Sequence, residues 1–130
     1  MYLSKFTDYS FRALVYLAEN RDKLCTVEEL AKKLEISEHH LKKIIHKLAK
    51  TDLIISMKGR TGGLKLGLDP QYINLGEVLR VTEDNLNIAQ CFKEGCCPFM
   101  GAGCKLKGIM NESLSAFLNE FSRYTLQDLL

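Results

Sequence analysis

Apolar residues recur every three or four positions through the first third of the chain, a spacing typical of amphipathic helices. The first predicted helix covers residues 8–19, and its apolar positions are Phe11, Leu14, Val15 and Ala18. A second helix begins after Thr26, with Glu29 placed to complete a capping box. Ser37 then caps a third helix that runs to about Lys50. Two short helices joined by a tight turn predict a helix-turn-helix.

The pattern changes to that of strands after the third helix. Residues 53–57 are rich in β-branched side chains, and residues 64–68 alternate apolar and polar positions. The glycines within 58–63 supply a turn between the two runs, so together they predict a β-hairpin with a basic tip. Asn74 then caps a fourth helix, predicted over residues 75–83.

The last segment predicts a long helix over residues 105–124, after an irregular stretch at 85–104. Its apolar residues follow a 4-3-4-3 spacing: Met110, Leu114, Phe117, Phe121 and Tyr124. Such a seam faces another helix, and the expected partner is the same helix of a second subunit in a homodimer. The whole pattern predicts a mainly α fold with a small β-hairpin. Its parts are a winged helix-turn-helix at 1–84, a cysteine-containing cluster-binding loop at 85–104 and a dimerisation helix with a C-terminal tail at 105–130.

Composition fits a cytoplasmic globular protein. The chain has 130 residues, of which 46% are hydrophobic and 26% charged, values ordinary for a domain with a buried core. Its longest apolar run, residues 13–18, is far too short to cross a membrane. Lys5, Asp8 and Arg12 stand where a signal peptide would need apolar residues, so no export is expected.

The net charge of +2 conceals a strongly basic segment at residues 37–65. Seven of the 18 Lys and Arg residues lie there against two acidic residues, together with all three His. A local excess of this kind attracts phosphate even when the whole chain is nearly neutral.

These features predict a winged helix on double-stranded DNA. The third helix would present polar side chains to base edges in the major groove: Ser37, Glu38, His39, His40, Lys42 and Lys43. Lys47 and Lys50 would meet phosphates. At the hairpin tip, Arg60, with Lys58 and Thr61 beside it, would enter the adjacent minor groove. The competing interpretation is a solvated basic face on a helical domain.

Four of the five cysteines lie in the irregular segment: Cys91, Cys96, Cys97 and Cys104. An odd number of cysteines argues against a disulfide framework. Three interpretations remain: an iron–sulfur cluster, structural zinc, although paired Cys-x₂-Cys knuckles are missing, and a thiol switch. The spacing favours a metal site without deciding between iron–sulfur and zinc. Cys25 stands apart and is expected to be a buried small residue.

Three stretches make the chain similar to a known family. Residues 2–18, 58–68 and 73–80 resemble the corresponding segments of the Rrf-type bacterial winged-helix transcriptional regulators, and the resemblance covers essentially the whole chain. It implies a dimer of winged-helix subunits joined by the long C-terminal helix. It also implies that this dimer binds a near-palindromic DNA operator.

Within that family the cysteine segment is most similar to the nitric-oxide-sensing repressors. The resemblance implies Cys91, Cys97 and Cys104 as ligands, with Cys96 as a substitute for Cys97. It also suggests Asp8, reaching across from the partner subunit, as a fourth ligand. The competing interpretation of Asp8 is an acidic residue that the helix dipole favours near a helix N-terminus. The implied cofactor is a [4Fe-4S] cluster, with [2Fe-2S] as the alternative.

The sequence therefore predicts a repressor whose operator affinity depends on an iron–sulfur cluster and responds to nitric oxide. The nearer alternative is a regulator of the same family that responds to iron–sulfur supply, redox state or a partner protein, with a [2Fe-2S] cluster or none. A redox enzyme on the same scaffold is the more distant alternative. The sequence has no paired carboxylates, phosphate-binding glycine loop or Cys-x-x-Cys motif to support it.

Overall fold

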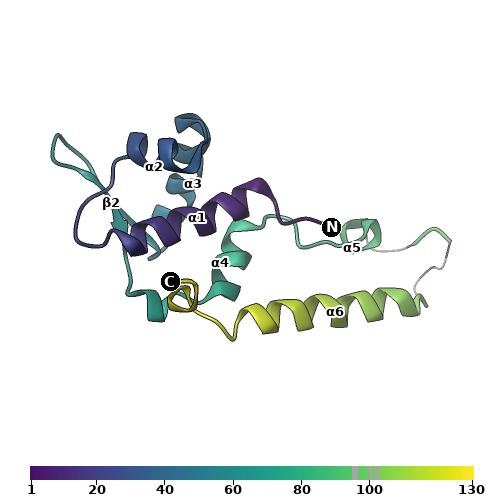
Figure 1. The fold of residues 1–130 in the computed structure, drawn as a ribbon. Coiled ribbons are helices and arrows are strands. Elements are labelled where there is room, and N and C mark those ends of the chain that lie inside the picture. The colour runs from purple at the N-terminus through teal and green to yellow at the C-terminus, as the bar shows by residue number, and fades with distance from the viewer. Residues whose placement is uncertain (95–96, 100, 102) are drawn as a thin grey trace.

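A computed structural model of the chain describes residues 1–94, 97–99, 101 and 103–130. Most of the chain is helical, with a small two-stranded sheet at one edge of the helices and one long helix that extends away from the rest (Figure 1). The longer elements, in chain order, are α1 (Lys5–Glu19), α2 (Val27–Leu34), α3 (Glu38–Ala49), β1 (Ile54–Met57), β2 (Gly63–Leu66), α4 (Leu75–Thr82) and α6 (Lys105–Phe121). The shorter ones are η1 (Pro70–Tyr72), α5 (Gln90–Glu94) and η2 (Leu126–Leu129).

The predicted helix-turn-helix is confirmed, and its caps are the residues that the sequence indicates. The Thr26 hydroxyl accepts a hydrogen bond of 3.0 Å from the Glu29 amide at the start of α2. The Ser37 hydroxyl accepts one of 3.1 Å from the His40 amide at the start of α3. Between the two helices Glu35 takes the left-handed conformation, with φ of 55°. These local bonds set the tight turn that α2 and α3 share.

The predicted hairpin is also confirmed. Strands β1 and β2 are antiparallel, with Ile54 opposite Leu66. Gly59, at φ of +108°, allows the chain to reverse at the tip. A further bridge joins Leu64 to Cys25, whose amide donates to the Leu64 carbonyl over 2.9 Å. Cys25 is fully buried, as expected from its position before α2.

A single apolar core lies between α1, α2, α3, α4 and the sheet. Its fully buried side chains include Leu14, Leu17, Leu30, Leu41, Ile44, Leu48, Ile54, Leu64, Ile73, Val78 and Leu126. Leu126 belongs to η2, so the end of the chain closes the core beside α1. This core holds α3 and the hairpin in one fixed relation.

The structure differs from the predicted boundaries in three places. Helix α1 begins at Lys5 rather than residue 8, because the Ser4 hydroxyl accepts a hydrogen bond from the Thr7 amide and caps it earlier. Residues expected to be irregular include the short helix α5. Helix α6 ends at Phe121, so Tyr124, the last residue of the predicted helix, lies beyond the observed one. There the chain turns back, and the Leu75 amide donates to the Tyr124 carbonyl over 3.0 Å.

Helix α6 leaves the core at its C-terminal end and runs beside the segment that carries α5 (Figure 1). None of its described residues is buried within this chain. Among the described residues, no helix is both long enough and apolar enough to cross a membrane.

Candidate nucleic-acid interface and cysteine segment

One side of α3 is polar, basic and open to solvent. We call this surface the recognition face: Ser37, Glu38, His39, Lys42, Lys43, His46 and Lys50. Six of these seven residues were predicted to contact DNA. His46 was not, although its spacing of three and four from Lys43 and Lys42 places it on the same side of the helix. Glu38 lies 3.9 Å from Lys42, an exposed pair that leaves the surface basic.

Two predicted DNA contacts lie on a different side of α3, turned toward α1. The His40 ring meets the Tyr9 ring edge-on, with centroids 5.7 Å apart. Lys47 donates to the Asp84 carboxylate, and its ammonium lies 5.4 Å from the centre of the Phe6 ring. Both side chains are only half exposed. Their assignment to DNA therefore competes with contacts that they already make inside the molecule.

The tip of the hairpin presents the predicted wing. Lys58, Arg60 and Thr61 are all exposed, and so is Lys65 on β2, a basic residue not predicted as a contact. A basic loop beside a basic helix face can follow adjacent grooves of a duplex. The core fixes the two surfaces relative to each other, since Leu64 of β2 and Leu41 of α3 are both buried in it.

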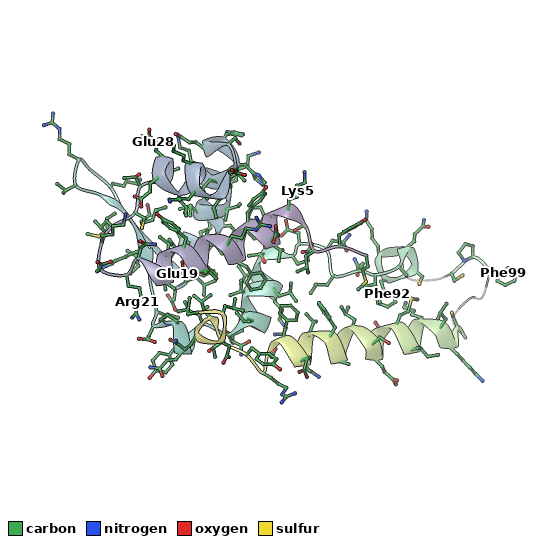
Figure 2. All side chains as sticks on the ribbon, viewed as in Figure 1. Lys5, Glu19, Arg21, Glu28, Phe92 and Phe99 are labelled. Carbon is green, nitrogen blue, oxygen red and sulfur yellow. The ribbon has the colours of Figure 1, made fainter. Side chains whose placement is uncertain are left out.

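The segment that carries three of the predicted cysteine ligands joins α5 to α6, at the end of the molecule where Figure 2 labels Phe92 and Phe99. Cys91 lies on α5, and Cys104 is the residue that precedes α6. The Cys97 carbonyl accepts a hydrogen bond of 2.8 Å from the Gly101 amide. These three cysteines are half-buried and form no disulfide. Cys96 lies outside the described residues.

The structure does not gather these cysteines into a finished metal site. Among the described residues, no three His, Cys, Asp or Glu side chains come close enough to hold a metal ion. The donor set itself suits iron–sulfur chemistry, because three thiols can become thiolates, the ligands that such clusters require. The segment also contains Gly101, at φ of +61°, where the backbone turns.

Asp8 lies in the first turn of α1, as expected. Its carboxylate pairs with Arg12 one turn later, at 3.0 Å, and about half of the Asp8 side chain is exposed. Arg12 in turn lies over the Tyr9 ring, 5.5 Å from its centre. Asp8 is thus accessible to another molecule, but a ligand role would draw it away from Arg12.

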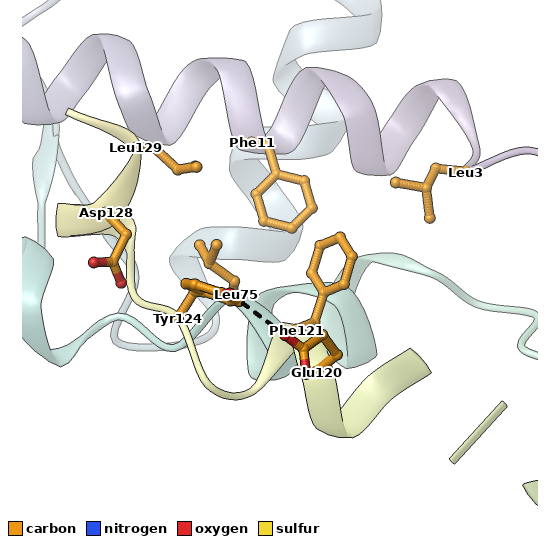
Figure 3. A pocket seen from close by; sticks show the side chains of 8 residues that line it. All are labelled: Leu3, Phe11, Leu75, Glu120, Phe121, Tyr124, Asp128 and Leu129. Atoms are coloured by element: carbon orange, nitrogen blue, oxygen red, sulfur yellow. Dashed lines mark hydrogen bonds between the residues drawn. The ribbon is translucent and has the colours of Figure 1, made fainter. Parts of the chain in front are cut away.

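An apolar cavity of about 680 Å³ lies between α1, the start of α4 and the C-terminal turn (Figure 3). Two predicted dimer residues, Phe121 and Tyr124, help to line it. The Phe121 ring lies 6.2 Å from the ring of Phe11 on α1, and the Tyr124 hydroxyl donates to Glu120 over 3.4 Å. The cavity walls are mainly carbon, which favours packing rather than acid–base chemistry.

The residues of the predicted α6 seam differ in how far the rest of this chain covers them. Leu114 and Phe121 line a second cavity of about 580 Å³ against residues 85–88 of the same chain. In contrast, Leu106 and Ile109, outside the predicted seam, are each 59% exposed, and Phe117 is 37% exposed. The exposed apolar residues of α6 therefore include Phe117 of the predicted seam and two residues outside it, Leu106 and Ile109.

Comparison with known proteins assigns the family. The Rrf2 family, described as an iron-dependent transcriptional regulator, matches residues 3–130. The HTH-type transcriptional regulator NsrR of Shouchella clausii is 43% identical over all of this chain and 89% of its own length. The Bacillus subtilis protein of the same name is 41% identical over all of this chain and 90% of its own length.

Solved structures confirm the fold. T. potens IscR superposes with a TM-score of 0.79 at 22% identity, covering 99% of this chain and 85% of that one. CymR, the global cysteine regulator of B. subtilis, gives a TM-score of 0.70 at 22% identity, covering 99% and 95%. The recognition face, the basic wing and the match over the whole chain lead to one conclusion. The protein belongs to the Rrf2 family of transcriptional regulators.

Proposed function

We propose that this regulator is a repressor whose operator affinity depends on an iron–sulfur cluster and is lost on exposure to nitric oxide. One observation carries the proposal. Three half-buried cysteines follow a winged-helix domain in a chain 37–44% identical, over its whole length, to proteins named NsrR. Thiols in such a segment suit iron, because thiolates are the usual ligands of iron–sulfur clusters.

Cys91, Cys97 and Cys104 would hold the cluster, with Cys96 as the substitute for Cys97 and Asp8 of the partner subunit as a fourth ligand. Ligation by Cys91 and Cys104 would join α5 to the start of α6. Ligation by the partner's Asp8 would first need that carboxylate to leave Arg12. A [4Fe-4S] cluster bound there would supply iron that is reactive toward nitric oxide. Asp8 is the weakest of these ligands, since carboxylate suits such iron less well than thiolate.

DNA binding belongs to the recognition face and the wing. Each subunit of a dimer would place α3 in a major groove, with Arg60 at the adjacent minor groove. The cysteine segment would act by shifting the population of subunits whose recognition helices are correctly spaced. Loss of ligation would make that arrangement a minor state, which lowers the apparent operator affinity.

The test begins with anaerobic purification and measurement of visible absorption, iron and sulfide. Operator affinity is then measured before and after nitric oxide, on a duplex that the wild-type protein selects from a random pool (the selected duplex). Replacing Cys91, Cys97 or Cys104 singly by Ala is expected to abolish both the cluster and the binding. Comparing Cys96→Ala with Cys97→Ala identifies the middle ligand.

Two control variants separate the cluster from the DNA interface. Arg60→Ala should keep the cluster and bind the selected duplex more weakly, because only the wing is changed. Cys25→Ala should keep both, since Cys25 is buried between α2 and β2. Normal regulation by the three ligand variants would overturn the cluster mechanism.

A second candidate is a family member controlled by a partner protein or by thiol oxidation, without a cluster. The half-buried thiols of Cys91 and Cys104 favour it, because thiols that solvent reaches are open to oxidation. The same measurements decide between the two candidates. A colourless protein that binds the selected duplex equally well with and without iron would support the second.

A further inference from the structure

Lys47 differs from the other lysines of α3 in its surroundings. Its side chain is 33% exposed, whereas that of Lys42 on the recognition face is 64% exposed. Its ammonium donates to the Asp84 carboxylate and lies over the face of Phe6 on α1. The Lys47 ammonium is therefore already stabilised by an aromatic ring and a carboxylate. A DNA phosphate that bound Lys47 would have to replace these partners.

Asp84 is held in place by its neighbour in sequence. The Glu83 carboxylate accepts a hydrogen bond of 3.0 Å from the Ser4 amide and one of 2.8 Å from the Thr7 hydroxyl. Thr7 is fully buried, so this junction fixes the chain after α4 against the start of α1. The backbone at Asp84 is therefore held in place, and from there the Asp84 carboxylate pairs with Lys47. The cysteine segment begins at the next residue, Asn85.

We propose that Lys47 is a positioning residue rather than a phosphate contact, and that the Lys47–Asp84 pair connects the recognition helix to the start of the cysteine segment. The pair sets how α3 sits against α1 and the end of α4. A phosphate that approached Lys47 would come close to the Asp84 carboxylate, which would repel it. The connection to the cysteine segment rests on the proposed function, whereas the positioning role does not.

The positioning role is tested by the salt dependence of affinity for the selected duplex, measured with the full chain. Lys47→Met and Asp84→Asn should each weaken binding by about threefold, the scale of an exposed ion pair. Neither variant should change the slope of the logarithm of the binding constant against the logarithm of the salt concentration. The matched control is Lys50→Met on the recognition face. It should lower that slope by about 0.9 for each phosphate that the lysine neutralises in the wild type.

Exchanging the two charges tests whether the ion pair itself, and not only the shape of either side chain, controls the affinity for the duplex. The double variant Lys47→Asp with Asp84→Lys should recover the affinity that either single change removes, because the pair is restored in reverse. Asp84→Asn cannot fail by unfolding the core, since the Asp84 side chain is 87% exposed. Two results would overturn the proposal: a reduced salt slope for Lys47→Met, or tighter binding by Asp84→Asn.

A second measurement tests the connection to the cysteine segment. In cluster-loaded protein, Asp84→Asn should keep the visible absorption and the iron content of the wild type. Its ratio of affinities before and after nitric oxide should fall toward one. An unchanged ratio would overturn the connection. If the wild type holds no cluster, the proposed function fails, while the salt and charge-exchange results still decide the role of Lys47.

Discussion

Glu29 joins three parts of the DNA-binding domain through one carboxylate. It accepts a hydrogen bond of 2.6 Å from the Tyr16 hydroxyl of α1 and another from Lys23 in the connection to α2. It stands in the first turn of α2, which Thr26 caps. The hydrogen bonds from Lys23 and then from Tyr16 lower the pKa of Glu29 below its ordinary value of 4.5. The ionised form is therefore the one that stabilises the fold.

Replacing Glu29 by Gln should lower the free energy of unfolding by about 1 kcal/mol at neutral pH, since both donors lose an ionised acceptor. A lowered folded-state pKa gives stability that is present above the unfolded value of 4.5 and lost as pH falls through the folded value. The difference between wild type and variant should therefore shrink below pH 4.5. Urea unfolding at neutral and acidic pH measures it. An equal difference at both pH values would contradict this account.

At the scale of single residues, interactions between residues close together in the sequence could be predicted, and those between distant residues could not. Thr26, Ser37 and Asn74 were recognisable as caps because each bonds to an amide three residues later. Lys47 was recognisable as basic but not as paired, because its partner Asp84 lies in a distant part of the sequence. The wing residues were found because a glycine-rich tip is itself a local signal.

At the scale of elements, the docking of α6 depends on a glycine in α4. A Cβ added to Gly76 would lie 2.0 Å from the Ser122 hydroxyl and 3.0 Å from the Ser122 Cα. Asn74 also donates to the Ser122 carbonyl over 2.8 Å, and Arg80 donates to the Ser122 hydroxyl over 3.2 Å. The end of α6 therefore approaches α4 closely, which stops the helix at Phe121 and directs the chain back to the core.

Gly76→Ala should lower the free energy of unfolding by about 1–3 kcal/mol through overpacking, although alanine favours helices. Gly108→Ala in α6 is the matched control, because nothing lies within 4 Å of a Cβ built there. It should be neutral or stabilising. Adding Ser122→Gly to Gly76→Ala should recover part of the loss, as thermal unfolding would show. A harmless Gly76→Ala would mean that α6 does not need this close approach.

Elements with a repeated pattern were therefore predictable, and those set by tertiary contact were not. The helices from α1 to α4 show clear apolar spacing or a cap. Helix α5 spans five residues, too few for a period to appear. The end of α6 was placed too late because Tyr124 continues the heptad spacing, whereas the contacts of Ser122 and Tyr124 with α4 join residues that are distant in the sequence.

At the scale of the whole molecule, α6 is too apolar for a helix that packs so little within its own chain. The sequence indicated that it needs a partner and predicted the heptad seam that would face that partner, but Leu106 and Ile109 lie outside that seam. Leu114, Phe117 and Phe121 line the cavity against residues 85–88 of the same chain. The apolar stripe that remains most exposed is Leu106 and Ile109, each 59% exposed. We propose that this stripe contributes to the homodimer interface, beside the predicted positions Met110 and Tyr124.

Ile109→Glu should therefore convert the dimer to a monomer. Burying an isoleucine side chain contributes about 1.5–3 kcal/mol, and a two-fold interface contains the residue twice. The expected dissociation constant rises at least about tenfold, measured by sedimentation at several protein concentrations. Asn111→Glu adds the same charge to an exposed position of the same helix and should leave the dimer intact. The monomer should also lose most of its affinity for the selected duplex, because two half-sites then bind independently.

A dimer that survives Ile109→Glu would place the interface elsewhere. A loss of dimer with Asn111→Glu as well would mean that net charge, not the apolar stripe, controls assembly.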